Sequence, residues 1–321
     1  MNLEKAQGDQ CLESQGPPPF ITRTVHRLGD GTLAVWSSRH HRKDLPPPEV
    51  LVAGAIRRAF FRGWWLAGDF NWWIGLIFVV GSLLFILGSI GTLWPELPMA
   101  AVANPATVFF VGSVPFTLAA LLQFYQAGTT TEFPKDAVAS GQRKATQRKL
   151  LGCRLSELGW WSCLLQLIGT FLFNLSTYQA LHPGPNWVSE DIWVWVPNFA
   201  GSILFLLSGY MAFAETCHEY WRYLPGNLSW WAVFWNLSGC LGFMISAFLA
   251  VLVSNADPVT RLQLSTWFTL LGAIGFLLGS MLLMPEAATE GEQDSLLNGP
   301  DRRRQRIFST ESVADLKSQN G

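Results

Sequence analysis

A nine-residue pattern that recurs inside long apolar segments sets the strongest limit on how this chain can fold. Its first copy runs from Gly81 to Ser89 with the sequence GSLLFILGS. Every copy opens with Gly and a small residue, places Phe fifth and Leu or Ile seventh, and closes with two small residues. The later copies occupy residues 112–120, 169–177, 201–209, 239–247 and 272–280. Recurrence in one register predicts an internally repeated architecture.

Each copy lies in an apolar segment near the ~20 residues that cross ~30 Å of hydrocarbon. Half of the 321 residues are hydrophobic and only 14% are charged, a composition typical of membrane proteins with several spans. The predicted spans are residues 71–93, 105–125, 158–181, 193–215, 230–253 and 264–284. The predicted fold class is therefore an all-α polytopic membrane protein with six transmembrane helices, and its first partner is the lipid bilayer.

Paired tryptophans indicate that the spans are organised as helical hairpins. A Trp-Trp pair ends eight residues before the motif Gly in the first, third and fifth spans only. The pairs are Trp72-Trp73, Trp160-Trp161 and Trp230-Trp231. The sequence thus predicts one hairpin used three times. The expected regions are a polar N-terminal region at 1–62, hairpins at 63–126, 158–215 and 230–284, a basic loop at 127–157, a short connection at 216–229 and a disordered tail at 285–321.

The motif also predicts how the helices pack. On an α-helix its Gly, its Phe and its closing small residues fall on one narrow face. Helices in lipid associate through close packing, which small residues permit, because no hydrophobic force drives them together. We therefore expect the Phe of one helix to lie over the Gly of its neighbour.

The Gly-Ser-x-x-Phe-x-x-Gly-Ser core, as in GSLLFILGS at Gly81 and GSILFLLSG at Gly201, resembles the YrhK-like membrane module. That module is a short two-helix hairpin domain without an assigned biochemical role. Residues 71–284 are also similar to larger, fungal integral membrane proteins built around it. The family unit is one hairpin, whereas this chain has three. The resemblance implies a helical-hairpin fold and supplies no catalytic or binding residues.

The charge of the connections predicts the orientation in the membrane. Residues 94–104 and 182–192 contain no Lys or Arg, whereas residues 126–157 contain six basic residues and the chain after residue 284 contains five. The positive-inside rule then places both termini and the 126–157 loop in the cytoplasm.

Three features stand out in the polar N-terminal region. Thr22–Leu28 and Thr32–Ser38 flank Gly29-Asp30-Gly31, which is a signal for a β-hairpin. A basic run, RHHRK, follows at residues 39–43. Residues 49–65 have the pattern of a basic amphipathic helix, which would either lie on anionic lipids at the membrane surface or lead directly into the first span.

The end of the fourth predicted span offers the best candidate for a metal site. Glu215, His218 and Glu219 would share one helical face, and such a set of carboxylates and imidazole could bind a metal ion or relay protons. The favoured alternative is an interfacial helix end where Glu219 pairs with Arg222. We therefore predict no metal, cofactor or catalytic residue, with those three side chains as the weak candidates for metal.

Amide side chains inside the spans carry the main functional alternative. They are Gln123, Gln166, Asn174, Asn198 and Asn236. Such amides more often bond between helices, but they could also line a solute path. A transporter needs a polar cavity within the membrane, whereas a packing module has a dry core. Convergence of Gln166, Asn198 and Asn236 on a water-sized cavity would favour the transporter.

Nothing in the sequence supports an enzyme. It contains no nucleophile elbow, zinc-protease, phosphate-loop or dinucleotide-binding motif. The carboxylates that flank spans are expected to cap or anchor helices: Asp69, Glu96, Glu157 and Glu286. A net charge of −1 gives no reason to expect nucleic acid. The leading expectation is a non-enzymatic packing, scaffold or sensing module, with self-association as a homo-oligomer among its options; the alternative is a small-solute or ion transporter.

Overall fold

The computed structural model describes residues 10–27, 33–43, 65–98, 103–129, 152–182, 191–252 and 257–298. Within them, six helices are long and apolar enough to cross a membrane, and they confirm the predicted fold class. The helices are α3 (Phe70–Leu93), α5 (Pro105–Thr129), α7 (Leu158–Leu181), α9 (Val196–Cys217), α10 (Leu228–Leu252) and α11 (Pro258–Asn298). The amphipathic helix expected at 49–65 falls, apart from its last residue, outside the described residues.

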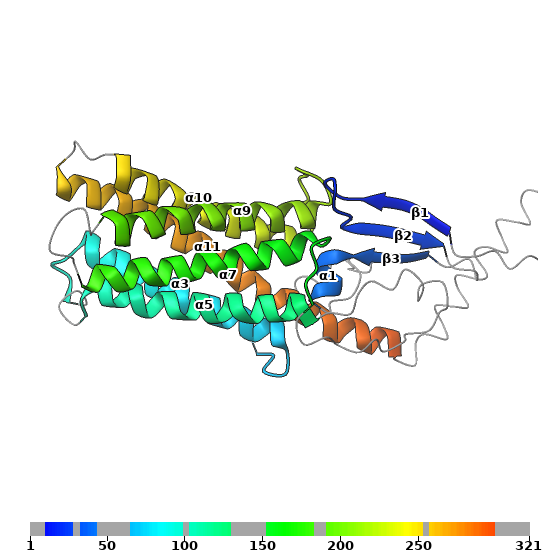
Figure 1. Ribbon diagram of the computed structural model, residues 1–321. Helices are drawn as coiled ribbons and strands as arrows, with labels where there is room; N and C mark the ends of the chain where they lie inside the picture. Colours follow the sequence, from blue (N-terminus) through cyan, green and yellow to red (C-terminus); the bar gives the residue numbers. More distant parts are fainter. Residues whose placement is uncertain are drawn as a thin grey trace, which may run out of the picture.

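The six helices form a closed ring. Each one packs against the helix before and after it in the chain, and α11 returns to pack against α3. Figure 1 shows them side by side along a common axis, with the β-strands at one end, which we call the sheet end. A π-helical turn, η2 (Asp191–Trp195), leads into α9 at the opposite end.

The six motif phenylalanines meet in the middle of the ring. All are buried, and they join one core cluster with centroids of contacting rings 4.9–6.2 Å apart. They are Phe85, Phe116, Phe173, Phe205, Phe243 and Phe276, and we call them the Phe layer. The layer takes one ring from every span, so no helix can leave the bundle without opening it.

Each Phe of the layer lies over the motif Gly of its hairpin partner, as predicted. A Cβ added to Gly81 would lie 2.8 Å from a ring carbon of Phe116, and one added to Gly112 would lie 3.0 Å from Phe85. The corresponding pairs are Gly169 with Phe205, Gly201 with Phe173, Gly239 with Phe276 and Gly272 with Phe243. At five of these positions an added Cβ would press on the ring at 2.8–3.0 Å, whereas at Gly169 it would lie 3.2 Å from the Gly201 carbonyl oxygen and 3.6 Å from the Phe205 ring.

The Trp-Trp pairs fix the start of each hairpin at the sheet end. The first Trp of every pair is buried, and its ring meets the second edge-on at 86°. The second indole donates a 3.0 Å hydrogen bond to the carbonyl six residues earlier in all three hairpins. These bonds join Trp73 to Ala67, Trp161 to Leu155, and Trp231 to Pro225. The three helices therefore begin with the same local structure.

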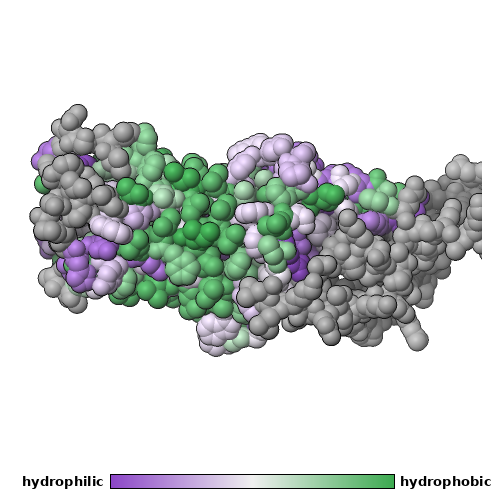
Figure 2. All heavy atoms as spheres, in the orientation of Figure 1, coloured by the Kyte–Doolittle hydropathy of each residue, from purple (hydrophilic) through white to green (hydrophobic). Residues whose placement is uncertain are grey.

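The outer surface of the ring is apolar. Many of the exposed side chains on the helices are large and aliphatic, among them Leu83, Leu87, Val111, Leu118 and Leu271. Figure 2 shows a hydrophobic band over the middle of the bundle with hydrophilic residues toward both ends. This surface is compatible with contact to a lipid bilayer.

A small β-unit precedes the ring. Strands β1 (Gln10–Gln15), β2 (Arg23–Arg27) and β3 (Leu33–Ser37) form an antiparallel sheet in that order, followed by the short helix α1 (Ser38–Arg42). The pairing of β2 with β3 confirms the predicted hairpin, whose turn lies outside the described residues. Strand β1 was not predicted.

Helix α11 is longer than expected. It continues past Pro285 to Asn298, so the first part of the tail predicted to be disordered is helical instead. The sequence there, AATEGEQDSLLN, is rich in the good helix formers Ala, Glu, Gln and Leu, which extends a helix already held by the ring.

The close fit of Phe against Gly makes a direct prediction. A Cβ at residue 201 would lie 2.8 Å from the Phe173 ring and 3.2 Å from the Gly169 carbonyl oxygen. Gly201→Ala should therefore lower the free energy of unfolding by about 1–3 kcal/mol, because overpacking forces backbone shifts. Tryptophan fluorescence in detergent micelles measures this. Gly226→Ala is the control, since no atom lies within 4 Å of its added Cβ; equal stability of the two variants would contradict the packing account.

Candidate functional site

The basic run at residues 39–43 enters the sheet end of the ring instead of facing solvent. The backbone N–H of Ser38 donates to the carbonyl of Thr22, which holds α1 against the sheet. Arg39, Arg42 and Lys43 are 4%, 5% and 4% exposed. A buried cation is tolerated only where it is paired. We call the β-unit and α1, residues 10–27 and 33–43, the cap.

Glu286 of α11 receives two of the three cations. Arg39 donates through Nε at 3.0 Å and Nη2 at 3.2 Å, one bond to each carboxylate oxygen. Lys43 Nζ lies 2.7 Å from Oε2, and the Ser229 hydroxyl of α10 donates at 2.6 Å to Oε1. With two hydrogen bonds on each oxygen, the carboxylate is fully engaged between the cap and the ring.

Glu215 of α9 receives the third cation. Arg42 Nη2 lies 2.8 Å from Oε2, and the Ser38 hydroxyl donates to Oε1. Glu215 is completely buried. A Cβ at Gly159 of α7 would lie 2.5 Å from Arg42 Nε and closer still to a Glu215 oxygen, so only glycine leaves room for this pair.

An amide pair makes the third contact between the cap and the ring. Asn71 Nδ2 donates to the Lys43 carbonyl at 3.0 Å, and Gln126 Nε2 donates to Asn71 Oδ1 at 2.9 Å. Gln126, Glu215 and Glu286 each stand ten residues after the Phe of their own motif. The cap is therefore bonded to all three hairpins: directly to Glu215 and Glu286, and in the first hairpin to Asn71, which Gln126 supports.

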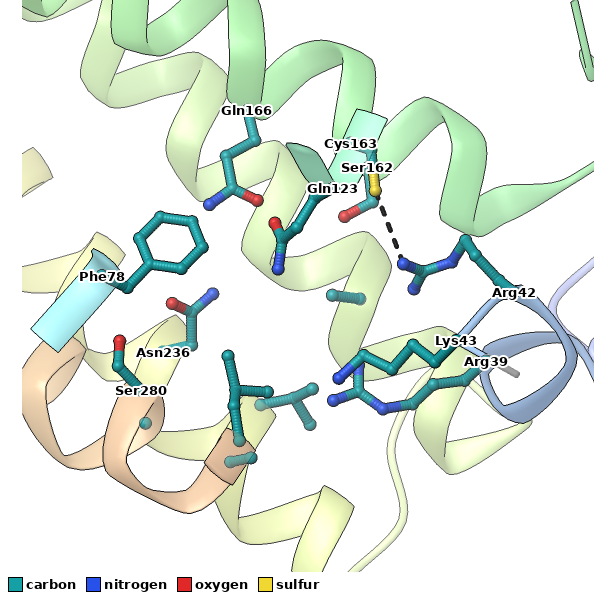
Figure 3. A pocket seen from close by; sticks show the side chains of 15 residues that line it. Arg39, Arg42, Lys43, Phe78, Gln123, Ser162, Cys163, Gln166, Asn236 and Ser280 are labelled. Atoms are coloured by element: carbon teal, nitrogen blue, oxygen red, sulfur yellow. Dashed lines mark hydrogen bonds between the residues drawn. The ribbon is translucent and has the colours of Figure 1, made fainter. Parts of the chain in front are cut away.

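A cavity of about 40 Å³ lies under α1 on the axis of the ring. Every span contributes the residue that stands seven positions from its motif Phe on the side of the sheet end. These residues are Phe78, Gln123, Gln166, Ala212, Asn236 and Leu283. Each hairpin thus supplies one amide, and Figure 3 shows the three amides around a space that the cations of α1 reach from the other side.

Several polar side chains around the cavity have hydrogen-bonding groups without a protein partner. Among the described residues, the side chains of Gln123, Gln166 and Asn236 make no hydrogen bond, and Arg42 Nε is buried without a partner. A water molecule needs at least about 10–15 Å³ of such volume, so the cavity has room for about three. Amide groups that face a cavity without protein partners can bond to a polar occupant, such as water or a small solute.

Charge around the cavity is unbalanced. Among the described residues, three cations of the cap meet two carboxylates, Glu215 and Glu286, which leaves one positive charge in excess. Burial, reinforced by the nearby Arg39, lowers the pKa of Lys43 to about 8. Burial also opposes the charge on Arg42, but the adjacent Glu215 carboxylate outweighs it and holds the pKa of Arg42 above its ordinary value. At neutral pH the cap therefore keeps all three charges, though Lys43 is close to losing its proton.

The side chains suggested for a metal site do not come together. Helix α9 ends at Cys217, and His218 has a left-handed backbone with φ of 59°, so the expected common helical face is absent. Glu215 faces the cap, His218 Nδ1 lies 3.0 Å from the Thr22 hydroxyl, and exposed Glu219 pairs with Arg222 at 3.5 Å. The described residues contain no group of three His, Cys, Asp or Glu side chains that could hold a metal ion.

The other polar candidates have separate roles. Asp69 caps α3 by accepting from Trp72 N at 2.9 Å, as expected, whereas Glu157 pairs with Arg154. Asn174 donates to the Thr117 hydroxyl at 2.7 Å. Asn198 does not line the cavity, so two of the three amides named for a solute path converge on it, together with Gln123.

Two histidines at the junction between the cap and the ring predict sensitivity to acid. Burial lowers the pKa of His40 and of His218 to about 4, from a usual value near 6.5. Between these two pH values the unfolded chain binds more protons than the folded chain, so stability is present above pH 6.5 and is lost as pH falls toward 4.

Thermal unfolding followed by tryptophan fluorescence should show the midpoint falling across this window. The double variant His40→Gln, His218→Gln should show a smaller fall than the native protein. His182→Gln is the matched control, because this histidine is exposed at the other end of the bundle. A pH profile that is the same for all three proteins would contradict the assignment.

The sequence matches no family model and no curated protein, and the fold matches no solved structure. The chemistry of the cap and of the cavity beneath it is therefore the basis for assigning a function.

Proposed function

We propose that this protein is a non-enzymatic, multi-pass membrane module that works as a sensor. Its cap docks on the end of a stable helical ring and can undock from it. One observation carries this proposal: the end of the cap, residues 39–43, places three cations in the end of the ring, where Glu215 and Glu286 accept them. A segment that only linked a terminus to the membrane would have no need to bury charges there.

Buried ion pairs suit a switch better than they suit a permanent joint. A buried pair adds little net stability over apolar packing, but removing one partner costs about 3–5 kcal/mol because a charge is left buried alone. The ring does not depend on these pairs, since the Phe layer and the Phe–Gly contacts hold its six helices together. The cap can therefore dock and undock while the ring persists.

The charge of the connections supports a cytoplasmic position for the cap. The basic residues between 49 and 64 would then lie next to the inner leaflet, where anionic lipids are a plausible contact. A relation to the YrhK-like hairpin, with three copies in one chain, is part of the proposal. Its support is that all three hairpins make the same Phe–Gly contacts and begin with the same Trp-Trp structure.

Cys163 provides a native reporter of cap docking. It is 3% exposed, it lines the cavity, and its Sγ accepts from Arg42 Nη1 at 3.5 Å. In a background without the exposed Cys11 and Cys153, Glu215→Gln and Glu286→Gln should raise the rate of Cys163 alkylation at least tenfold. Each change leaves buried cations without their counter-charge and so favours undocking.

Mass spectrometry identifies the labelled thiol, and Cys240 is the internal control. Cys240 is 1% exposed and lies against Gly209 in the ring, away from the cap. Selective labelling of Cys163 indicates undocking, whereas parallel labelling of both thiols would indicate unfolding of the ring. No increase at Cys163 in either variant would contradict a cap held by these ion pairs.

Passage of a small solute is the second candidate, and the convergence of Gln123, Gln166 and Asn236 on the cavity favours it. The Phe layer opposes it. The layer lies directly beyond the cavity, and the void of about 10 Å³ within it is lined mainly by phenyl rings. A continuous polar path would require these rings to separate.

Flux measurements in liposomes distinguish the two candidates. We expect no ion or small-solute flux above that of empty liposomes, either for the native protein or for Glu286→Gln, in which the cap is released. Flux that appears on release of the cap and grows further in Phe243→Ala would instead support a gated path through the Phe layer.

A further inference from the structure

We propose that the cavity under α1 binds one small monovalent anion of halide or nitrate size, as the counter-ion that completes the docked cap. This inference rests on the proposed function, because the docked cap forms one wall of the site. Nothing in the motif pattern or in the ring itself requires an anion there; the requirement comes from the charges that the cap brings.

The first argument is the charge count. Arg39 and Lys43 share Glu286, and Arg42 pairs with Glu215, so within the described part of the chain three cations have two counter-charges. All five side chains are nearly or fully buried. An uncompensated charge in such surroundings is expensive, and a bound anion would neutralise it.

The second argument is the set of donors. The amide groups of Gln123, Gln166 and Asn236 carry N–H donors, and none of these side chains has a hydrogen-bond partner among the described residues. The cationic side chains of Arg39, Arg42 and Lys43 also line the cavity. Ser280 also lines the cavity, as does Ser162, whose hydroxyl already donates to the Ser208 carbonyl. Among the residues that line it there is no carboxylate, so no acidic side chain competes with a bound anion.

The third argument is size and access. A space for about three water molecules accepts a halide or a planar nitrate, but it is small for a sulfate or phosphate ion with its hydration. The cavity lies on the ring axis and takes lining residues from all six spans and from α1. A phospholipid cannot place its head group there while its acyl chains stay in the bilayer. The ligand class is therefore a small free anion.

Anion binding and cap docking must then strengthen each other. If an anion favours the docked cap by a certain factor, the docked cap favours the anion by the same factor. The concentration of a common small anion would set the fraction of protein with the cap in place. Under this proposal, the signal that the sensor detects is the concentration of a small anion.

The test uses purified full-length protein in detergent or nanodiscs, in buffers where gluconate replaces chloride. Direct binding is measured by broadening of the chloride NMR signal, with bromide and nitrate as competitors. Cap docking is measured in the same samples by the alkylation rate of Cys163. Ionic strength is held constant with gluconate, because screening alone weakens ion pairs. We expect saturable binding of chloride, bromide and nitrate, and slower Cys163 alkylation when they bind.

Three variants locate the site. Asn236→Leu removes one donor and should weaken anion binding about tenfold or more. Gln166→Glu places a carboxylate inside the cavity, where it acts as a tethered anion; it should protect Cys163 in gluconate and abolish chloride binding. Asn198→Leu is the matched control, because this amide lies in α9 and does not line the cavity. It should bind chloride like the native protein.

The outcomes separate this inference from the proposed function. Equal effects of chloride and gluconate, or chloride binding that survives in both Asn236→Leu and Gln166→Glu, would overturn the anion site. If Cys163 is protected in every buffer and no anion binds, the cap docks without an anion: the anion site is wrong and the proposed function is retained. If Cys163 of the native protein reacts rapidly in every buffer, the docked cap itself is wrong.

Discussion

The seating of a phenyl ring over a glycine of the neighbouring helix is the contact on which this structure depends. In lipid, apolar side chains gain nothing by leaving one apolar surface for another, so helices need close and complementary packing to associate. Each hairpin makes the contact twice, once in each direction, and the six rings then meet on the axis of the ring. A tightly packed Phe layer results, and the two ends of the bundle can differ around it.

The same register places everything else along the axis. Seven residues from the Phe layer toward the sheet end, each span turns a side chain into the cavity. Ten residues after the motif Phe, Glu215 and Glu286 bond to the cap, and Gln126 bonds to Asn71, which itself bonds to the cap. The first helix of each hairpin supplies Asn71, Gly159 or Ser229 beside that contact. The packing motif therefore determines where along the bundle axis each of these polar side chains lies.

Much of the fold could be predicted from the sequence because its signals are local. Span lengths, the Phe–Gly contact and the β2–β3 hairpin depend on residues close together in the chain or related by a repeat. The junction of cap and ring could not be predicted in this way, because Lys43 and Glu286 are 243 residues apart and nothing near either residue indicates its partner. The metal hypothesis for Glu215 failed because it assumed a helix that continues past Cys217. One signal was available: Glu215 and Glu286 occupy the same motif position.

The three positions that receive the cap have different chemistry, and this difference has a geometric consequence. One hairpin offers an amide pair, one a glutamate beside a glycine, and one a glutamate beside a serine. If the three hairpins were identical at this end, the cap could dock in three equivalent orientations related by 120° rotations about the ring axis. Here only one rotation places Arg42 in the gap over Gly159 while Arg39 and Lys43 reach Glu286. The ring is therefore nearly three-fold symmetric in its helix packing, but its polar end accepts the cap in a single orientation.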